Sequence, residues 1–366
     1  MTTIAEVAER AGVGVATVSR VLNGSPAVSE PTRHRVLAVI DELGYEPNAA
    51  ARALSTGRTR TVGVVARICA QRSVVERMHG IFRVMAGSGY QLAVFDLEQA
   101  APLAELSVSG RLDGLLCISL CPSDAVLERY DAAGVPVVLV DCEHPRLSGA
   151  STDDVEGGRL AAEHLLGLGH RRIAFVGDEE DDPFGFTSSA RRRIGAAAAL
   201  AAAGLDLLVR CGPHGREQSR ALASELLNLE EPPTAVFAGS DLQALGVLEA
   251  AEAAGLDVPG DLSVMGFDDV EVARYAGLTT VAQPLEESGV RGAQLLLEAM
   301  RGGPRVVQRL PLQLVVRSTT AAPRAPAAVG RRNTKAAGTA PAASSRQDGI
   351  IPLDVTGLGG AQCPDV

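Results

Sequence analysis

The sequence predicts an α/β protein with a small all-α head of the helix-turn-helix type and a body of two doubly wound α/β halves. Three observations predict this class. Two short helical segments flank a glycine turn near the amino terminus. Apolar runs alternate with helical segments over most of the remaining chain. The length of 366 residues exceeds one ordinary domain, so two or three domains are expected.

Composition allows large cores and places any nucleic-acid contact in the head. Apolar residues make up 46% of the chain and aromatic residues only 3%, without tryptophan, so Ala, Val, Leu and Ile must fill the cores. The net charge is −10, but residues 1–60 hold seven arginines and six acidic residues, which gives +1 there and −11 elsewhere. An acidic body repels phosphate, so binding to nucleic acid would be local to the head and steeply salt-dependent.

The chain is expected to be a cytoplasmic protein that needs no metal or cofactor. Its start lacks a basic region followed by an apolar one, and no apolar run reaches the length that spans a membrane. The cysteines form no CxxC pair and most lie in apolar runs, which favours reduced core thiols over disulfides or metal ligands. They are Cys69, Cys117, Cys121, Cys142, Cys211 and Cys363.

The first helix of the head has a clear start and stop. Thr3 followed by Glu6 predicts a capping box, in which each side chain accepts a hydrogen bond from the other residue's amide. The helix is expected to run to about Ala11. Gly12 then supplies the positive φ that a tight turn between helices requires.

Two more helices complete the head. Gly14 is a tolerated N-cap for a second helix over 15–22, which ends at the left-handed stop signal Asn23-Gly24. Ser29 is expected to cap a third helix, which Gly44 closes. The spacing of four apolar residues predicts a small common core: Val18, Leu22, Val36 and Ile40.

The second helix has the features of a recognition helix in the major groove. Arg20 can make a bidentate contact with guanine. Thr17 and Ser19 can bind phosphate, and Val15 and Ala16 can contact thymine methyl groups. The alternative is a three-helix packing domain whose arginine is merely solvated.

The segment after the head suggests a hinge helix. Pro47 and Asn48 begin a short alanine-rich stretch that includes Ala51, and such small residues let two helices approach closely. Leu54 would then be an apolar wedge that enters the minor groove and kinks the duplex. Alone, the stretch would be read as an ordinary linker. The predicted DNA-binding residues are Thr3, Val15, Ala16, Thr17, Ser19, Arg20, Asn23, Asn48, Ala51 and Leu54.

The body alternates strands and helices in two sets. Strands are expected at 61–66, 91–95, 113–118 and 136–140, and then at 172–176, 205–209, 234–238 and 262–265. Helices are expected near 73–86, 124–133, 157–168, 188–203, 216–229 and 241–254, with a late helix over 286–300 and a strand over 312–316. Two doubly wound halves are the natural solution.

The motifs of the head and body together resemble the LacI/GalR family of bacterial transcription repressors. The resemblance is carried by Ala16-Thr17-Val18-Ser19-Arg20-Val21-Leu22-Asn23-Gly24, Leu43-Gly44-Tyr45, Gly266-Phe267-Asp268-Asp269 and Gln283-Pro284, among others. It implies a homodimer on pseudo-palindromic double-stranded operator DNA, with Leu54 intercalating at the operator centre. It also implies a periplasmic-binding-protein-like body with a small effector, of the carbohydrate class, between two lobes joined by three crossovers.

Two charged residues are the main effector-binding candidates. Arg192 precedes Gly195 by three, as the family's effector-binding arginine does, and Asp268 is expected at the carboxyl end of a strand. The alternatives are a solvated helix charge for Arg192 and a loop cap for Asp268. Where the family often has Asn-Pro-aromatic, the chain has Gln71-Arg72-Ser73, so Phe184 or Phe186 would have to supply an aromatic wall. The predicted set is Ser73, Phe186, Ser188, Arg192, Ser240 and Asp268.

The resulting interpretation is a ligand-gated repressor and not an enzyme. A solute-binding receptor shares the two-lobed body, but the head and the start of the chain argue against it. A sugar-handling enzyme is the third class, yet no Walker loop, nucleophile elbow or HExxH is found. The predicted domains are a head (1–46), a hinge (47–60), lobe 1 (61–156 and 285–304), lobe 2 (157–284 and 305–320) and a disordered tail rich in Ala, Pro and Gly (321–366).

Overall fold

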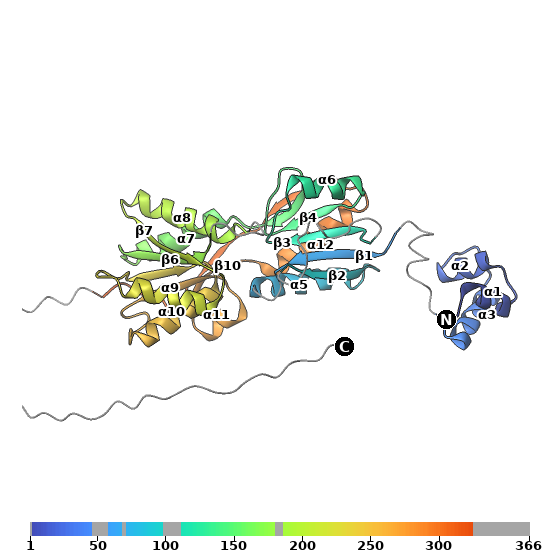
Figure 1. The fold of residues 1–366 in the computed structure, drawn as a ribbon, viewed down its shortest axis with the longest axis horizontal. Helices are drawn as coiled ribbons and strands as arrows, with labels where there is room; N and C mark the ends of the chain where they lie inside the picture. Colours follow the sequence, from blue (N-terminus) through green and yellow to red (C-terminus); the bar gives the residue numbers. More distant parts are fainter. Residues whose placement is uncertain (1, 46–57, 68–70, 98–110, 180–185, 325–366) are drawn as a thin grey trace, which may run out of the picture. The chain divides into compact units, whose positions relative to one another are not determined.

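The computed structural model describes residues 2–45, 58–67, 71–97, 111–179 and 186–324 (Figure 1). Three predicted hinge residues, Asn48, Ala51 and Leu54, lie outside these ranges, as do Phe184 and residues 325–366. Among the described helices, none has both the length and the apolar character needed to cross a bilayer.

The head contains the three predicted helices, α1 (Ile4–Ala11), α2 (Val15–Leu22) and α3 (Glu30–Leu43). The capping box is present, because the Thr3 hydroxyl accepts from the Glu6 amide and the Glu6 carboxylate accepts from the Thr3 amide, both at 3.3 Å. Gly12 has the expected positive φ of 65°. At the end of α2, Gly24 takes the left-handed conformation, whereas Asn23 does not.

A small aliphatic core holds these helices together. Val18 and Val36 are fully buried as predicted, while Leu22 and Ile40 pack at its edge. The Ser29 hydroxyl, expected to cap α3, donates to the Thr32 hydroxyl instead. The buried residues are Val7, Ala8, Ala11, Val18, Val21, Val28, Val36 and Val39.

Lobe 1 is a parallel sheet of order β11-β5-β4-β3-β1-β2. Its strands are β1 (Thr61–Ala66), β2 (Gln91–Asp96), β3 (Gly114–Ile118), β4 (Val137–Val140), β5 (Ser148–Ser151) and β11 (Val307–Arg309). Its helices are α5 (Arg72–Met85), α6 (Asp124–Ala132) and α12 (Leu285–Ala299). The central strands are buried on both faces, as their continuous apolar runs predict.

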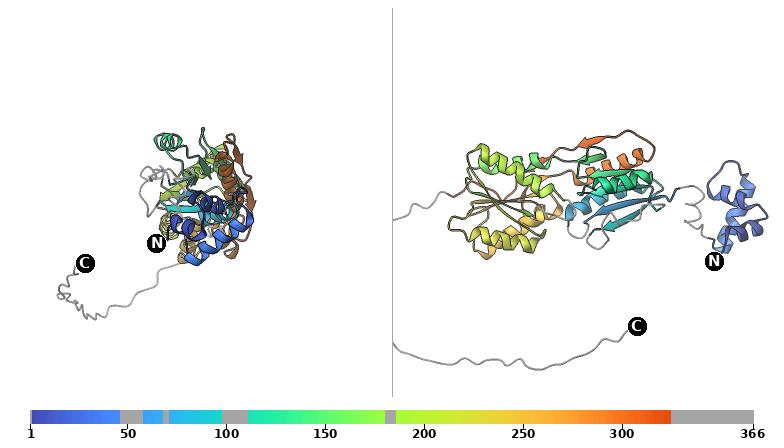
Figure 2. Two further views of the ribbon diagram at one scale, coloured as in Figure 1. Left: turned by 90° about the vertical axis from the view of Figure 1, so that its right-hand side faces the viewer. Right: turned by 45° about the horizontal axis from the view of Figure 1, so that its top comes forward.

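Lobe 2 repeats this plan with the order β12-β10-β9-β8-β6-β7, in which only β12 is antiparallel. The pair α7 and α8 covers one face of the sheet, and α9 and α10 cover the other (Figure 2). The strands are β6 (Ile173–Asp178), β7 (Leu207–Gly212), β8 (Ala235–Ala238), β9 (Ser263–Asp268), β10 (Thr279–Ala282) and β12 (Gln313–Val315). The helices are α7 (Asp154–Gly167), α8 (Ser188–Ala202), α9 (Arg216–Leu227), α10 (Asp241–Ala253) and α11 (Glu271–Tyr275).

Glycines bring one helix pair of each lobe into backbone contact. A Cβ on Gly158 of α7 would overlap the carbonyl oxygen of Arg192 in α8. In lobe 1, a Cβ on Gly289 of α12 would overlap the carbonyl oxygen of Arg77 in α5. Both arginines are therefore fixed at a helix–helix contact that admits no side chain on the facing residue.

The predicted division between the lobes needs two corrections. β11 pairs in parallel with β5, as in Val307↔Gly149, so residues 305–309 belong to lobe 1 and not to lobe 2. Helix α7 packs in lobe 2 from Asp154 onward, three residues before the predicted boundary. The crossovers therefore follow Ser151, Ala282 and Arg309. Strands β5, β10 and β11 and helix α11 were not predicted, because they are short and lack an extended apolar run.

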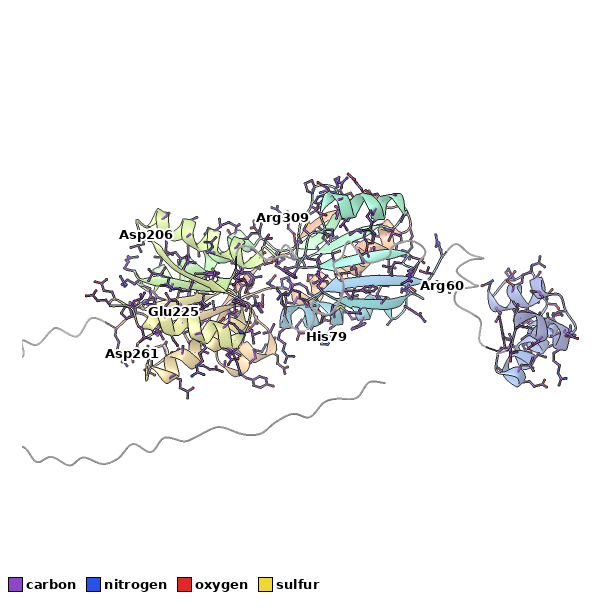
Figure 3. All side chains as sticks on the ribbon, viewed as in Figure 1. Arg60, His79, Asp206, Glu225, Asp261 and Arg309 are labelled. Carbon is purple, nitrogen blue, oxygen red and sulfur yellow. The ribbon has the colours of Figure 1, made fainter. Side chains whose placement is uncertain are left out.

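The expected tail also begins too early. The carbonyl oxygen of Ala321 accepts from the Ser263 hydroxyl at 3.0 Å, and Arg324 pairs with Asp261 at 2.5 Å. Asp206 and Asp261, labelled in Figure 3, lie at the edge where the strands of lobe 2 begin. Residues 321–324 are thus packed on lobe 2, so the prediction of disorder from residue 321 is wrong for these four residues.

Candidate DNA-binding face and effector cavity

The second helix presents the predicted DNA-reading residues on its outer side. Val15 is 45% exposed, and Ala16 and Arg20 are exposed beside it. Thr17 and Ser19 are half-buried, which places their hydroxyls at the margin of this face. No acidic side chain in the described ranges forms an ion pair with Arg20, so its guanidinium can reach a base or a phosphate.

Two other predicted DNA contacts have local structural roles. Thr3 is the N-cap of α1, and its hydroxyl is used by the capping box. The Asn23 side-chain amide donates to the Ser19 hydroxyl at 3.5 Å, just beyond the last turn of α2. Both residues are exposed, so these bonds leave them accessible to a phosphate.

A narrow cavity of about 40 Å³ lies at the carboxyl ends of the strands of both lobes. This is the edge at which open α/β sheets bind ligands. All six predicted effector-binding residues line it: Ser73, Phe186, Ser188, Arg192, Ser240 and Asp268. Four titratable groups that were not predicted join them: Arg72, Asp141, Asp178 and His214.

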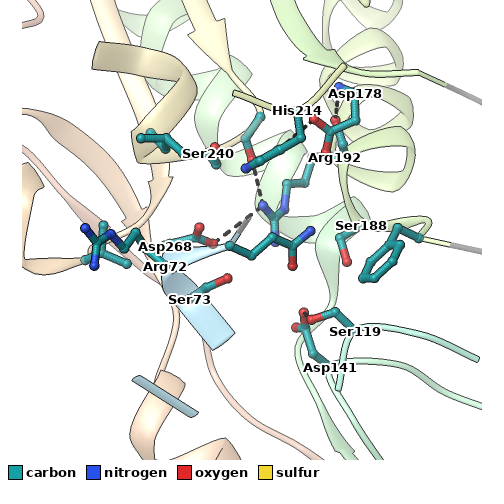
Figure 4. Close-up of a pocket in the computed structure, with 16 residues that line it drawn as sticks. Arg72, Ser73, Ser119, Asp141, Asp178, Ser188, Arg192, His214, Ser240 and Asp268 are labelled. Carbon is teal, nitrogen blue, oxygen red and sulfur yellow. Dashed lines mark hydrogen bonds and ion pairs between the residues drawn. The ribbon is translucent and has the colours of Figure 1, made fainter. Parts of the chain in front are cut away.

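Arg192 is held firmly at the cavity wall. It is only 5% exposed, and its Nε donates to Asp154 at 2.8 Å while Nη1 donates to the Gly239 carbonyl oxygen at 2.7 Å. Asp268 lies 3.5 Å from the same Nη1 (Figure 4). The guanidinium also stacks on the ring of Phe267, 3.7 Å from its centroid. The alternative of a solvated helix charge is therefore wrong.

Asp268 is a buried acceptor and not a loop cap. Its carboxylate accepts from the side-chain amide of Gln283 at 2.6 Å. Burial raises the pKa of Asp268, although the Arg192 guanidinium opposes this shift. Burial likewise raises the pKa of Asp154 to about 6, again against the opposing charge of Arg192. The positive charge of Arg192 thus stabilises two buried carboxylates, Asp154 and Asp268.

A second buried arginine lies behind the opposite wall, in lobe 1. Arg77 is 1% exposed, and its Nη2 contacts the Asp141 carboxylate at 2.6 Å. Ser119 donates to the other oxygen of Asp141 at 2.8 Å. Among the described residues, the Nε and Nη1 atoms of Arg77 find no hydrogen-bond partner. Nothing in the sequence marked this residue, because an arginine within a helix is usually solvated.

A carboxylate orients the imidazole that lines the cavity. His214 Nδ1 lies 2.9 Å from Asp178 Oδ1 (Figure 4). The same oxygen accepts from the Gln243 side chain at 2.9 Å. Because Nδ1 is engaged, Nε2 is the nitrogen left for a ligand. His214 follows the carboxyl end of β7, and that position was the signal that could have identified it.

Comparison with known proteins places both parts of the chain. Residues 3–48 match the profile of bacterial regulatory proteins of the lacI family, and residues 162–320 match a periplasmic binding protein-like domain. The HTH-type transcriptional regulator CelR of Thermobifida fusca is 36% identical over 336 residues, which cover 87% of this chain and 98% of CelR. The chain belongs to the LacI family.

Solved structures of LacI-family regulators confirm the predicted fold. A CelR–cellobiose complex matches with a TM-score of 0.63 at 33% identity, covering 87% of this chain and all of that one. The lac repressor dimer bound to operator and the anti-inducer ONPF matches with a TM-score of 0.76 at 29% identity, covering 88% and 99%. A helix-turn-helix head and a two-lobed periplasmic-binding-protein-like body are therefore established for this LacI-family chain.

In this LacI-family body, Gln283 joins the two lobes. It lies on the crossover between β10 and α12, and its side-chain carbonyl accepts from Thr152 at 2.9 Å and from Arg77 at 3.1 Å. Its amide nitrogen donates to Asp268. A continuous chain of buried polar contacts therefore runs from Asp141 through Arg77 and Gln283 to the cavity residue Asp268.

The aromatic wall of the cavity comes from lobe 2. The guanidinium of Arg67, just after β1, lies over the Phe186 ring at 5.1 Å from its centroid. Ser73 takes the lobe 1 side. Within the described residues, no group of three His, Cys, Asp or Glu side chains is placed to hold a metal ion.

Proposed function

We propose that the chain is a homodimeric transcriptional repressor whose affinity for a pseudo-palindromic operator is switched by a small carbohydrate in the cavity. One observation carries this proposal. A single chain combines a recognition helix with an outward reading face and a cavity lined by all six residues predicted to contact an effector. A head of this kind favours a regulator over a solute-binding receptor.

The lining of the cavity favours a polyhydroxylated ligand. Serine hydroxyls approach from both lobes, as at Ser73 and Ser188, and can donate to or accept from sugar hydroxyls. The Arg192–Asp268 pair adds fixed donors and acceptors in a site largely shielded from water. Phe186 offers one ring for stacking. The cellobiose bound by CelR is consistent with this class.

The switch would act through lobe closure. An effector shifts an equilibrium only by its different affinity for the two states, and residues of both lobes line the cavity. Closure would reposition the Gln283 contacts and, with them, the start of β1, from which the hinge leads to the head. Exposed apolar side chains on lobe 1, Phe82 and Val94, support self-association of the body.

Genome-wide footprinting with the full-length protein tests the DNA-binding part. The parent should protect a set of related palindromes.

Arg20→Ala should cost about 1–3 kcal/mol of binding free energy and relax the preference at one base position. Arg10→Ala is the control, because Arg10 lies on α1 and pairs with Glu42. A loss that is equal for every sequence would make Arg20 a phosphate contact and contradict the assignment.

Leu54→Ala tests the hinge. If Leu54 is a wedge between base pairs, the variant should bind the footprinted operator more weakly and bend it less, because the unstacking contact is gone. Gel-shift titration and a circular-permutation bending assay measure both effects. An operator affinity and bend equal to the parent's would remove Leu54 from the interface.

A further inference from the structure

Two cysteines meet beside the cavity. Strands β3 and β4 run in parallel, and their last paired residues are Ile118 and Val140. Cys121 follows the first strand by three residues and Cys142 follows the second by two. Since paired strands are about 4.8 Å apart, the loops that leave them at the same edge are neighbours.

The two sulfur atoms lie beside the same backbone oxygen. The Cys121 sulfur lies 4.0 Å and the Cys142 sulfur 3.9 Å from the carbonyl oxygen of Glu143. Both cysteines are free thiols and half-buried, so small molecules in solvent can reach them. Cys117, the second-last residue of β3, is fully buried.

The two neighbouring thiols differ in their pKa values. The hydrogen bond from Cys142 lowers the pKa of Cys121 to about 7, although burial and the nearby Asp124 carboxylate act in the opposite direction. The same bond, and then burial, raises the pKa of Cys142. At neutral pH, Cys121 thus has substantial thiolate character and Cys142 keeps its proton. A thiolate is the nucleophilic form of cysteine.

We propose that Cys121 and Cys142 form a reversible disulfide on exposure to a peroxide, and that this bond rigidifies the lobe 1 wall of the cavity. The Cys121 thiolate attacks one peroxide oxygen, the O–O bond breaks, and the departing hydroxide is protonated to water. The Cys142 sulfur then attacks the resulting sulfenic acid, the S–O bond breaks, and the hydroxide leaves as water with the thiol proton. Peroxide gains two electrons and the thiol pair loses two. A low-molecular-weight thiol reverses the change.

The proposed disulfide would lie next to residues that line the cavity and to residues that contact the crossovers. Ser119 and Asp141, which line the cavity, lie in the same two loops and are joined by a hydrogen bond of 2.8 Å. Next to Cys142, the Glu143 carboxylate accepts from Ser151 at 2.7 Å and pairs with Arg309 at 3.0 Å. Ser151 and Arg309 each precede a crossover. A covalent link between the loops would therefore restrict groups that contact both the cavity and the interlobe connections.

Peptide mapping of the full-length protein tests the bond. The reduced chain is titrated with hydrogen peroxide, alkylated and digested without reductant. A peptide linking Cys121 to Cys142 should appear first, disappear with dithiothreitol, and be lost in Cys121→Ser and in Cys142→Ser. Cys211→Ser is the matched control and should form the link as the parent does. Over-oxidation of Cys121 without a link, or links through other cysteines, would overturn the proposal.

Hydrogen exchange tests the effect on the cavity wall. Amides of residues 119–124 and 141–147 should exchange more slowly in the oxidised parent than in the reduced parent. Treated Cys142→Ser should show no such difference. Unchanged exchange in the linked protein would overturn the second half of the proposal. Neither experiment uses DNA or a sugar, so failure of the proposed repressor function would leave both results intact and interpretable.

Discussion

The two lobes use the same position for different purposes. Arg77 lies in the helix after the first strand of lobe 1, and Arg192 lies in the helix after the first strand of lobe 2. The backbone of each is fixed against a glycine of the neighbouring helix. Each faces a carboxylate at the end of the fourth strand of its lobe, Asp141 or Asp268, and both aspartates have positive φ.

The surroundings of the two guanidinium groups differ. Arg192 has three polar partners, stacks on Phe267 and lines the cavity. Arg77 uses one nitrogen, Nη2, for both Asp141 and Gln283, and its Nε and Nη1 have no partner within the part of the chain that the structure describes. In lobe 2 the arginine thus lines the cavity, while in lobe 1 it contacts Gln283 on a crossover between the lobes. Both lobes therefore contain a buried arginine–aspartate pair at the same place in the fold, but the two pairs contact different parts of the molecule.

Removing Arg77 should have the largest effect on stability. Arg77→Met leaves the buried Asp141 carboxylate uncompensated, which costs about 3–5 kcal/mol when a buried pair is broken from one side. Chemical denaturation of the full chain measures it. The matched double variant Arg77→Met/Asp141→Asn should recover much of the loss. If the single variant is as stable as the parent, Arg77 does not have the role assigned to it.

Substituting the two contact glycines should have the next largest effect on stability, and the effect should be similar in the two lobes. Gly158→Ala and Gly289→Ala force a methyl group onto a backbone carbonyl, so each should destabilise the fold by about 1–3 kcal/mol. Gly167→Ala is the control, because nothing lies within 4 Å of its Cβ position and alanine favours helix by up to about 1 kcal/mol. A Gly158→Ala variant as stable as Gly167→Ala would show that the helices can separate freely.

A smaller, pH-dependent effect should distinguish lobe 2. The pKa of Asp154 is about 6 in the folded chain against an ordinary value of 3.8, so the folded state binds the proton more tightly. The contribution of Asp154 to stability is therefore present at low pH and is lost as the pH rises from about 4 through about 6. Relative to Asp154→Asn, the parent should lose unfolding free energy across this window. If the unfolding free energies of the parent and of Asp154→Asn changed with pH in the same way, the raised pKa assigned to Asp154 would be contradicted.

The sequence predicts the parts of this molecule that depend on local patterns. Strand β1 and helix α2 were predicted with their observed bounds, because apolar runs and caps define them. Strand β5, with the sequence Ser-Gly-Ala-Ser, has no such pattern and forms only because β4 and β11 pair with its two edges. A partner distant in sequence creates that strand, and no local rule identifies it.

The residues of the cavity and its surroundings divide in the same way, into those that a local pattern predicts and those that depend on partners distant in sequence. Arg192 and Asp268 could be found from a motif and from the end of a strand. Arg77 and Gln283 could not, because their roles arise where residues 206 positions apart meet. The predicted contacts Asn48, Ala51 and Leu54 remain predictions, since they lie outside the described residues.

Linked binding is the most direct test of the central claim, that a ligand in the cavity controls the head. Fluorescence anisotropy would follow the full-length protein on its footprinted palindrome while a panel of sugars that includes cellobiose is titrated. At least one sugar should change operator affinity by about 5–150-fold in the parent. Asp268→Asn should bind the duplex without sugar and give no response at the same sugar concentrations. A parent that ignores every palindrome in dilute buffer, or an Asp268→Asn variant that responds as the parent does, would contradict the claim.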